Sequence, residues 1–290
     1  MDLFWQILVS GGMLGSLYAL VGLGFVLIYR STRVVNFSQG EMLMLGAILA
    51  LYFYQDLKLP YGLAFVGSCV TVGLLGAFLE RVAFRPLQRA PVITLILATV
   101  AVGQMIRSAV RIVRGSEVSH FPPLFPTTPF TVGGVTLTAL TVGTVILSIF
   151  LVGALVLFIR YTRIGRGMEA AAQNRDAATL SGVSINQTFL LTWAVSSALA
   201  AAAGILIAPL IVITPDMGII GLKGFIGAIL GGFLTIPGAI AGCFLLGIIE
   251  NLAGYYISGA MKDVVSFGLL LLILIACPQG LFGRQEARRA

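Results

Sequence analysis

A group of polar residues stands at the start of an apolar segment near the N-terminus. Asn36, Ser38, Gln39 and Glu41 lie within six residues of one another. Hydroxyl, amide and carboxylate groups at such a position can cap the first turn of a helix, or they can face a solute inside a membrane. We assign Asn36 and Ser38 to the cap, and Gln39 and Glu41 to a candidate path. Gly40 could break the helix there and free backbone amides for a carboxylate.

A second polar pair, Glu250 and Asn251, interrupts another apolar run. A charge at the centre of a bilayer costs about 2.5 to 3.5 kcal/mol on insertion scales, so it normally faces the protein interior. Both residues are therefore candidates for the same path. Pairing with a neighbouring helix explains them equally well, and the two interpretations stay open.

Three arginines share one face of a predicted helix. Arg107, Arg111 and Arg114 recur at spacings of four and three, which places them on one side of the helix. They could form a basic rim that meets an acidic partner protein. We favour the simpler interpretation, in which the side chains reach lipid phosphates at the membrane surface.

Several kinds of chemistry are missing from the sequence. No Gly-x-x-x-x-Gly-Lys-Ser/Thr loop occurs, so we expect no ATP hydrolysis by this chain. The three cysteines have no disulfide or metal spacing, and the 11 carboxylates are too scattered to form a catalytic pair. We expect neither an enzyme nor a bound metal or cofactor in this chain.

The composition indicates a membrane protein. Of the 290 residues, 58% are hydrophobic and 10% are charged, whereas soluble domains carry about 25% charged residues. The mean hydropathy is +1.03. A water-facing surface cannot be built from so few charges, and the net charge of +7 is read as topology rather than as a nucleic-acid-binding surface.

Apolar segments long enough to cross a bilayer follow one another along the chain. About 20 residues are needed for each crossing. We predict an all-α, polytopic transmembrane helix bundle, a single domain over residues 1–290, with eight long spans and one short or re-entrant segment. The segments are 3–29, 38–55, 61–80, 92–113, 137–159, 187–211, the short 223–234, 237–256 and 264–283.

The basic residues predict the orientation. Two thirds of the 18 Lys and Arg residues fall in alternate connections, and such residues are enriched on the cytoplasmic side. This places the N-terminus outside and the C-terminus inside. The assignment requires that 223–234 crosses the membrane; a re-entrant segment would change it.

Two short echoes suggest an inverted repeat. Gly46-Ala-Ile-Leu recurs as Gly227-Ala-Ile-Leu, and Leu74-Leu-Gly followed by Glu80 recurs as Leu245-Leu-Gly followed by Glu250. Transporters are often built from such repeats, although short matches also arise by chance in a chain rich in Gly, Ala, Leu and Ile. A repeat would align the first four spans with the last four.

The connection at 160–186 differs in chemistry from the spans around it. Residues 168–181 are rich in alanine and predict a helix, with Glu169 in its first turn and Gly182 at its end. Met168, Ala172 and Leu180 cannot be buried by so short a helix alone. The segment therefore needs a partner surface, unless it is an ordinary loop whose arginines only fix topology.

Five motifs occur in the order typical of one family. They are Asn36-Phe-Ser-Gln-Gly-Glu41, Glu80-Arg-Val-Ala-Phe-Arg-Pro86, Arg160-Tyr-Thr-Arg-Ile-Gly-Arg166, Lys262-Asp-Val-Val-Ser-Phe267 and Pro278-Gln-Gly-Leu-Phe-Gly-Arg284. Over its whole length the chain resembles the branched-chain amino-acid permeases of ABC importers. The resemblance implies a second, similar permease, two cytoplasmic ATPases that bind the ATP, an external substrate-binding protein, and a bacterial inner membrane.

The resemblance also implies a role for the connection at 160–186, as the cytoplasmic coupling loop that docks on an ATPase. The residues that it points to are Arg166, Glu169, Ala170, Asp176 and Gly182. Glu169-Ala-Ala matches the start of the usual loop signature, but no glycine follows at the usual short spacing and no Ile-x-Leu-Pro ending occurs. The docking role is kept, and these residues are the expected contacts despite that departure from the signature.

The implied cargo is leucine, isoleucine, valine or a related small solute. Urea, short amides and aromatic acids are the alternatives within the same resemblance. A stand-alone channel or a secondary transporter is a further alternative, and it would not need a coupling loop.

Overall fold

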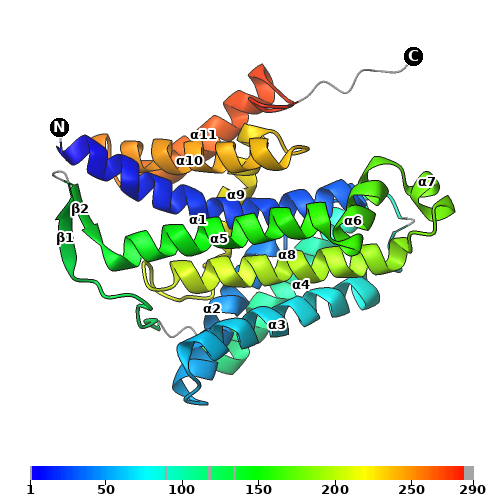
Figure 1. The fold of residues 1–290 in the computed structure, drawn as a ribbon, viewed down its shortest axis with the longest axis horizontal. Coiled ribbons are helices and arrows are strands. Elements are labelled where there is room, and N and C mark those ends of the chain that lie inside the picture. Colours follow the sequence, from blue (N-terminus) through cyan, green and yellow to red (C-terminus); the bar gives the residue numbers. More distant parts are fainter. Residues whose placement is uncertain (1, 89, 116–118, 133–134, 284–290) are drawn as a thin grey trace. The chain divides into compact units, whose positions relative to one another are not determined.

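The computed structural model describes residues 2–88, 90–115, 119–132 and 135–283, and these residues are predominantly helical (Figure 1). This confirms the all-α prediction. One antiparallel hairpin, β1 (Pro129–Val132) and β2 (Val135–Thr138), pairs Phe130 with Leu137. The helices are α1 (Asp2–Thr32), α2 (Gln39–Gln55), α3 (Tyr61–Leu79) with its π-helical continuation η1 (Glu80–Phe84), α4 (Val92–Arg114), α5 (Ala139–Tyr161), α6 (Arg163–Gln173), α7 (Arg175–Leu180), α8 (Ile185–Ile207), α9 (Gly218–Gly231), α10 (Ile236–Tyr256) and α11 (Met261–Ala276).

Each predicted span corresponds to a helix, but α2 and α11, which were predicted as long spans, are shorter than the others. In the described part of the chain, six helices are long and apolar enough to cross a membrane, and α9 forms a shorter apolar helix. The helix α2 has 17 residues because the chain turns at Asn36–Ser38 before it starts. The helix α11 has 16 residues and ends at Ala276, two residues before Pro278, where a proline disfavours continuation.

The chain divides into two compact units. Unit 1 comprises Met1–Val26, Pro123–Ile149 and Lys223–Ala290, and unit 2 comprises Leu27–Pro122 and Phe150–Leu222. Unit 1 therefore contains α10 and α11, and unit 2 contains α2, α3, α4, α6, α7 and α8. The remaining helices α1, α5 and α9 each give residues to both units.

Small residues let the helices of unit 2 approach closely. A Cβ on Gly204 of α8 would overlap the backbone of Leu43, and one on Gly46 of α2 would overlap Ala201. Close approach at small residues is how helices pack in lipid, where apolar burial gives no driving force. Near the other end of α8, the rings of Trp193 and Phe84 stack 4.3 Å apart. Most residues of α2 are buried.

The internal echo extends to the packing inside each unit. In unit 2, Gly76 of α3 lies against Ser197 and the carbonyl of Trp193, four residues apart on α8. In unit 1, Gly247 of α10 lies against Gly15 and the carbonyl of Gly11, four residues apart on α1. The same helix–helix contact therefore occurs in both units.

A second contact keeps the same register. Seven residues beyond Ser197, Gly204 packs on Leu43 of α2, and seven residues beyond Gly15, Gly22 packs on Gly224 of α9. The triplet α2, α3 and α8 thus matches the triplet α9, α10 and α1. Glu80 and Glu250 are not equivalent in this register, because they follow their glycines by four and three residues.

Candidate substrate path and coupling loop

The polar group before α2 forms a turn rather than the predicted cap. The Asn36 Oδ1 atom accepts hydrogen bonds from the Ser38 backbone N–H at 3.1 Å and from its hydroxyl at 2.6 Å. Ser38 occupies the N-cap position without capping the helix through its side chain. The break expected at Gly40 is also wrong, since α2 runs through it. Gly40 instead packs on Gly218, with no room for a side chain.

Gln39 joins α2 to α8. Its amide donates to the Ser196 carbonyl at 3.0 Å, and its Oε1 atom accepts from the Ser196 hydroxyl at 3.2 Å and from Asn36 at 3.4 Å. The side chain is fully buried. These contacts fix the rotation of α2 about its axis and hence the direction of Glu41, two residues later.

Glu41 pairs with a cation on α4. Its Oε1 atom accepts a hydrogen bond from the Arg107 guanidinium, and the Glu41 side chain is 7% exposed. Among the described residues, the Glu41 Oε2 and Arg107 Nε atoms are buried without a hydrogen-bond partner. Asp216 lies beside the pair, 2.8 Å from Arg111 and 3.9 Å from Arg107. One buried acceptor and one buried donor are therefore left open.

A cavity of about 510 Å³ adjoins this ion pair. The volume falls in the range of small-molecule sites, about 300–1,000 Å³. Its polar wall is made by Glu41, Arg107, Asp216 and Gln104, and its apolar wall by Phe37, Val100, Ile219 and Leu222. The cavity can accept a solute that has both a charged end and an apolar end. Of the two candidates at the start of α2, Glu41 lines this cavity, and Gln39 lies in the helix interface.

Glu250 and Asn251 have a different setting in unit 1. Glu250 Oε1 lies 2.5 Å from the Lys223 ammonium of α9, and its Oε2 accepts from Tyr18 of α1 at 3.0 Å and Ser266 of α11 at 3.3 Å. Asn251 donates to the Ile7 carbonyl at 2.8 Å. Both residues pair with neighbouring helices, which is one of the two roles that the sequence left open.

The arginine stripe on α4 has partners inside the chain. Arg107 pairs with Glu41, and Arg111 pairs with Asp216. The basic rim and the contact with lipid phosphates stay predictions, and Arg111 keeps about half of its side chain exposed. Asp216 escaped the sequence analysis because it lies in an irregular loop far from α4 in sequence. Lys223 was also missed as a partner of Glu250, although a lone cation at the start of an apolar segment indicates a need for a buried counter-charge.

The helix predicted at 168–181 is two helices. Asn174 breaks it in an extended conformation and caps α7 by accepting from the backbone amides of Asp176 and Ala177, both at 3.0 Å. Thr162 caps α6 through the amide of Gly165 at 2.9 Å. Glu169 therefore lies beyond the first turn of α6, contrary to the prediction. Gly182 ends the segment with a φ of +83°, as expected for a stop signal.

This loop rests on the ends of α1 and α8. Glu169 lies 3.7 Å from Arg30, and Arg175 donates to the Ser31 carbonyl at 3.1 Å while its guanidinium lies over the Phe189 ring. Burial and the nearby Arg33 lower the pKa of Arg175. Met168 is buried within this chain, which provides the partner surface expected for it, whereas Leu180 is 90% exposed. The loop has one packed face and one open face.

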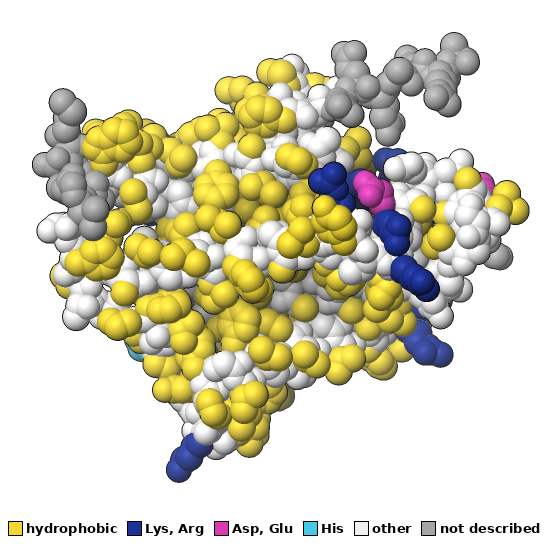
Figure 2. Space-filling view, in the orientation of Figure 1, with side chains coloured by type: hydrophobic (Ala, Val, Ile, Leu, Met, Phe, Trp, Pro, Cys, Tyr) yellow, Lys and Arg dark blue, Asp and Glu magenta, His cyan; other side chains and the backbone are white. Residues whose placement is uncertain are grey.

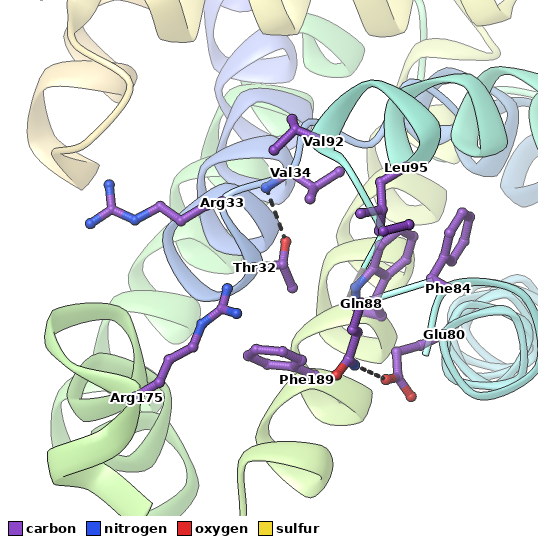
Figure 3. A pocket seen from close by; sticks show the side chains of 12 residues that line it. Thr32, Arg33, Val34, Glu80, Phe84, Gln88, Val92, Leu95, Arg175 and Phe189 are labelled. Atoms are coloured by element: carbon purple, nitrogen blue, oxygen red, sulfur yellow. Dashed lines mark hydrogen bonds between the residues drawn. The ribbon is translucent and has the colours of Figure 1, made fainter. Parts of the chain in front are cut away.

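A cavity of about 280 Å³ lies beside the loop (Figure 3). Thr32 and Arg33 at the end of α1, Glu80 in η1, Val92 at the start of α4, and Arg175 of α7 meet around it. These helix ends belong to connections predicted on one side of the membrane, so their meeting agrees with the order of crossings in unit 2. In Figure 2 most of the visible basic side chains lie at the end of the view where α6 and α7 lie, and apolar side chains cover α3 and α8. Arg89 and residues 284–290, which include Arg284, Arg288 and Arg289, lie outside the described residues.

The helices and the charged, partly apolar cavity define a polytopic membrane protein of the transport type. Residues 7–274 match the family described as branched-chain amino acid transport system, permease component. The chain belongs to this family.

Relatives with assigned names are similar to this chain over nearly its whole length. The chain is 33% identical to the high-affinity branched-chain amino acid transport system permease protein LivH of Escherichia coli K12, over 99% of this chain and 97% of the relative. It is 33% identical to BraD of Pseudomonas aeruginosa over 99% and 98%, and 29% identical to a probable LivH of Methanocaldococcus jannaschii over 97% and 94%. No solved structure matches the chain.

Proposed function

We propose that this chain is the membrane-spanning subunit of an ABC importer that moves leucine, isoleucine or valine inward. The observation that carries the proposal is the similarity along the full chain to permeases named for branched-chain amino acid transport. The cavity beside Glu41 supports it, because an amphiphilic solute matches its charged and apolar walls. ATP binds to partner subunits, and this chain carries no cofactor of its own.

The loop formed by α6 and α7 docks on one of two cytoplasmic ATPases. Its open face presents Arg166, Asp176, Leu180 and Gly182, all exposed, beside the half-buried Ala170. Its packed face joins α1 through Glu169 and α8 through Arg175. A movement of the ATPases would therefore reach two long helices at once. Glu169 contacts α1 through Arg30. The other four predicted contact residues, Arg166, Ala170, Asp176 and Gly182, are available to the ATPase.

The chain works in a bacterial inner membrane together with a second permease and an external substrate-binding protein. The N-terminus lies outside and the C-terminus inside. The basic residues that meet around the cavity of Figure 3 support this orientation, since they gather at the end that carries the coupling loop.

Co-expression tests the proposal. The chain is produced with the ATPase and permease genes that neighbour its own, the complex is purified through a tag on this chain, and labelled leucine uptake is measured in liposomes with ATP and loaded binding protein. We expect both ATPases to copurify and uptake to require ATP. Absence of any ATPase from the complex would overturn the proposal, and uptake by this chain alone would indicate a channel or secondary transporter. Uptake of urea or short amides in place of leucine would reassign the substrate.

A further inference from the structure

The cavity beside Glu41 and Arg107 has the charges of a site for a zwitterion. Two acids, Glu41 and Asp216, stand against two cations, Arg107 and Arg111, in one connected network. The four charges of this network sum to zero; Arg111 completes the network through Asp216 and does not itself line the cavity. An anion or a cation would unbalance this network, whereas a solute that carries one charge of each sign would not.

The open hydrogen-bonding atoms are also of opposite kind. The Glu41 Oε2 atom is an acceptor, the Arg107 Nε–H group is a donor, and both are buried with no partner among the described residues. A buried charged group without a full set of hydrogen bonds costs free energy. An α-ammonium group can donate to the first atom, and an α-carboxylate can accept from the second.

The surroundings hold this arrangement in place. Gln39 and Ser196 fix the start of α2 against α8, and Gly103 leaves room for the Glu41 side chain beside α4. Gly218, the first residue of α9, also lines the cavity, so the positive end of that helix dipole faces the same space and favours a carboxylate there.

The apolar wall sets the kind of side chain. Phe37, Val100, Ile219 and Leu222 line the cavity together with its charged groups. A branched aliphatic side chain would bury its surface against these residues, with a gain of about 25 cal/mol for each Å² removed from water. A solute without such a group, such as urea, would leave this wall uncovered.

We propose that Glu41 and Arg107 receive the ammonium and carboxylate groups of a transported amino acid, whose aliphatic side chain lies against Phe37, Val100, Ile219 and Leu222. The inference rests on the proposed function and adds the contact residues for the substrate. Arg107 and Asp216 were outside the path residues expected from the sequence. Gln39 acts as a positioning residue for Glu41.

The test uses the assembled complex in liposomes with saturating leucine-loaded binding protein. Uptake per assembled complex is compared for wild type, Glu41→Gln, Arg107→Gln and the double variant with both changes. We expect each single variant and the double variant to lose at least about tenfold, because each lacks a charge-assisted hydrogen bond to the substrate. Arg114→Gln is the matched control on the same face of α4, away from this cavity, and is expected to transport at the wild-type rate.

The double variant separates substrate binding from a purely structural ion pair. It buries a neutral pair of similar size and leaves no unpaired charge. Recovery of wild-type uptake by the double variant would overturn the inference, as would single variants that transport like wild type. Where a single variant yields no assembled complex, the double variant decides. A wild-type complex that fails to move leucine would instead refute the proposed function.

A direct binding measurement gives a second readout. Saturation-transfer NMR on the complex in nanodiscs, without binding protein, is expected to show leucine contacts in wild type and Arg114→Gln but not in Glu41→Gln. 4-Methylpentanoate, which lacks the ammonium group, and 3-methylbutylamine, which lacks the carboxylate, are expected to bind at least about tenfold more weakly than leucine. Equal binding of all three compounds would contradict recognition of both charged ends.

Discussion

Each of the two units contains one buried glutamate paired with a cation, and the two pairs differ in what remains open. In unit 1, both oxygens of Glu250 are taken, by Lys223 on one side and by Tyr18 and Ser266 on the other. In unit 2, one oxygen of Glu41 and one nitrogen of Arg107 have no partner in the described chain. The first carboxylate joins four helices, whereas the second joins two and faces a cavity.

The difference shows how one type of residue serves two purposes in a membrane. A carboxylate with every lone pair used is a fixed point between helices, and its neighbours cannot exchange partners without loss. A carboxylate with an open oxygen can accept a hydrogen bond from a further donor at little extra free-energy cost, because folding has already removed that carboxylate from water. Burial alone therefore does not identify a site; the unused atoms do.

The largest expected effect comes from breaking the filled pair. Lys223→Met removes the cation beside the buried Glu250 and leaves only the Tyr18 and Ser266 hydroxyls as hydrogen-bond donors to it. Removal of one member of a buried pair costs about 3–5 kcal/mol. We expect little monodisperse protein after detergent extraction, measured by size-exclusion chromatography. The double variant Lys223→Met/Glu250→Gln should recover much of the yield, and no recovery would contradict the pairing as the cause.

The repeated glycine contacts provide the next comparison. A Cβ on Gly247 would overlap the backbone of Gly15, whereas a Cβ on Gly76 would chiefly meet the Ser197 side chain. We expect Gly247→Ala to lower the free energy of unfolding of the purified protein by about 1–3 kcal/mol, measured by thermal unfolding. Gly76→Ala should cost less, and Ser197→Gly should offset it. Equal effects of the two alanine variants would show that the Ser197 side chain gives way no more easily than the Gly15 backbone.

The loop formed by α6 and α7, for which we propose ATPase docking, belongs to unit 2, and its exposed face allows a change that leaves the fold intact. Leu180 is 90% exposed on α7, so Leu180→Asp should alter the stability of this chain by no more than about 0.5 kcal/mol. We expect the amount of ATPase that copurifies to fall several-fold, measured by quantitative gel analysis. Thr179→Asp, at an exposed neighbouring position, serves as the control, and unchanged copurification in both variants would remove Leu180 from the docking surface.

The smallest expected effect is at the exposed edge of the charged network. Arg111 and Asp216 have side chains that are 49% and 67% exposed, and surface pairs contribute about 0–1 kcal/mol. Arg111→Gln should therefore shift the melting temperature of the purified protein far less than Lys223→Met does. A shift of similar size would show that the Asp216 network is as structural as the Glu250 network.

The sequence predicted the helices well because hydropathy and length decide them. Every expected span appears as a helix, and Gly182 ends the loop segment as its position suggested. The errors occur where a side chain competes with the local pattern. Asn174 looked like one polar residue in an alanine-rich helix, but its side chain caps α7 and divides the segment. Asn36 likewise takes the Ser38 hydroxyl away from the helix start.

The candidate site was only partly predictable. Glu41 and Gln39 lie in one polar group in the sequence, but which of them faces the cavity depends on the packing of α2 against α8. Asp216 and Arg107 are far from Glu41 along the chain, and no spacing rule joins them. Pairing of Glu250 with some neighbouring helix was one of two alternatives, and Lys223 as its partner follows only from the positions of α9 and α10.

The burial of α2 has a consequence for how the protein is made. This helix packs mainly on α3 and α8, and its polar start relies on Ser196 of α8. Translation proceeds at about 5–20 residues per second, so α2 leaves the ribosome on the order of ten seconds before α8 exists. During that interval Gln39 meets lipid or the insertion machinery instead of its final partner on α8. Biogenesis must therefore retain α2 in a provisional position until the second half of unit 2 is synthesised.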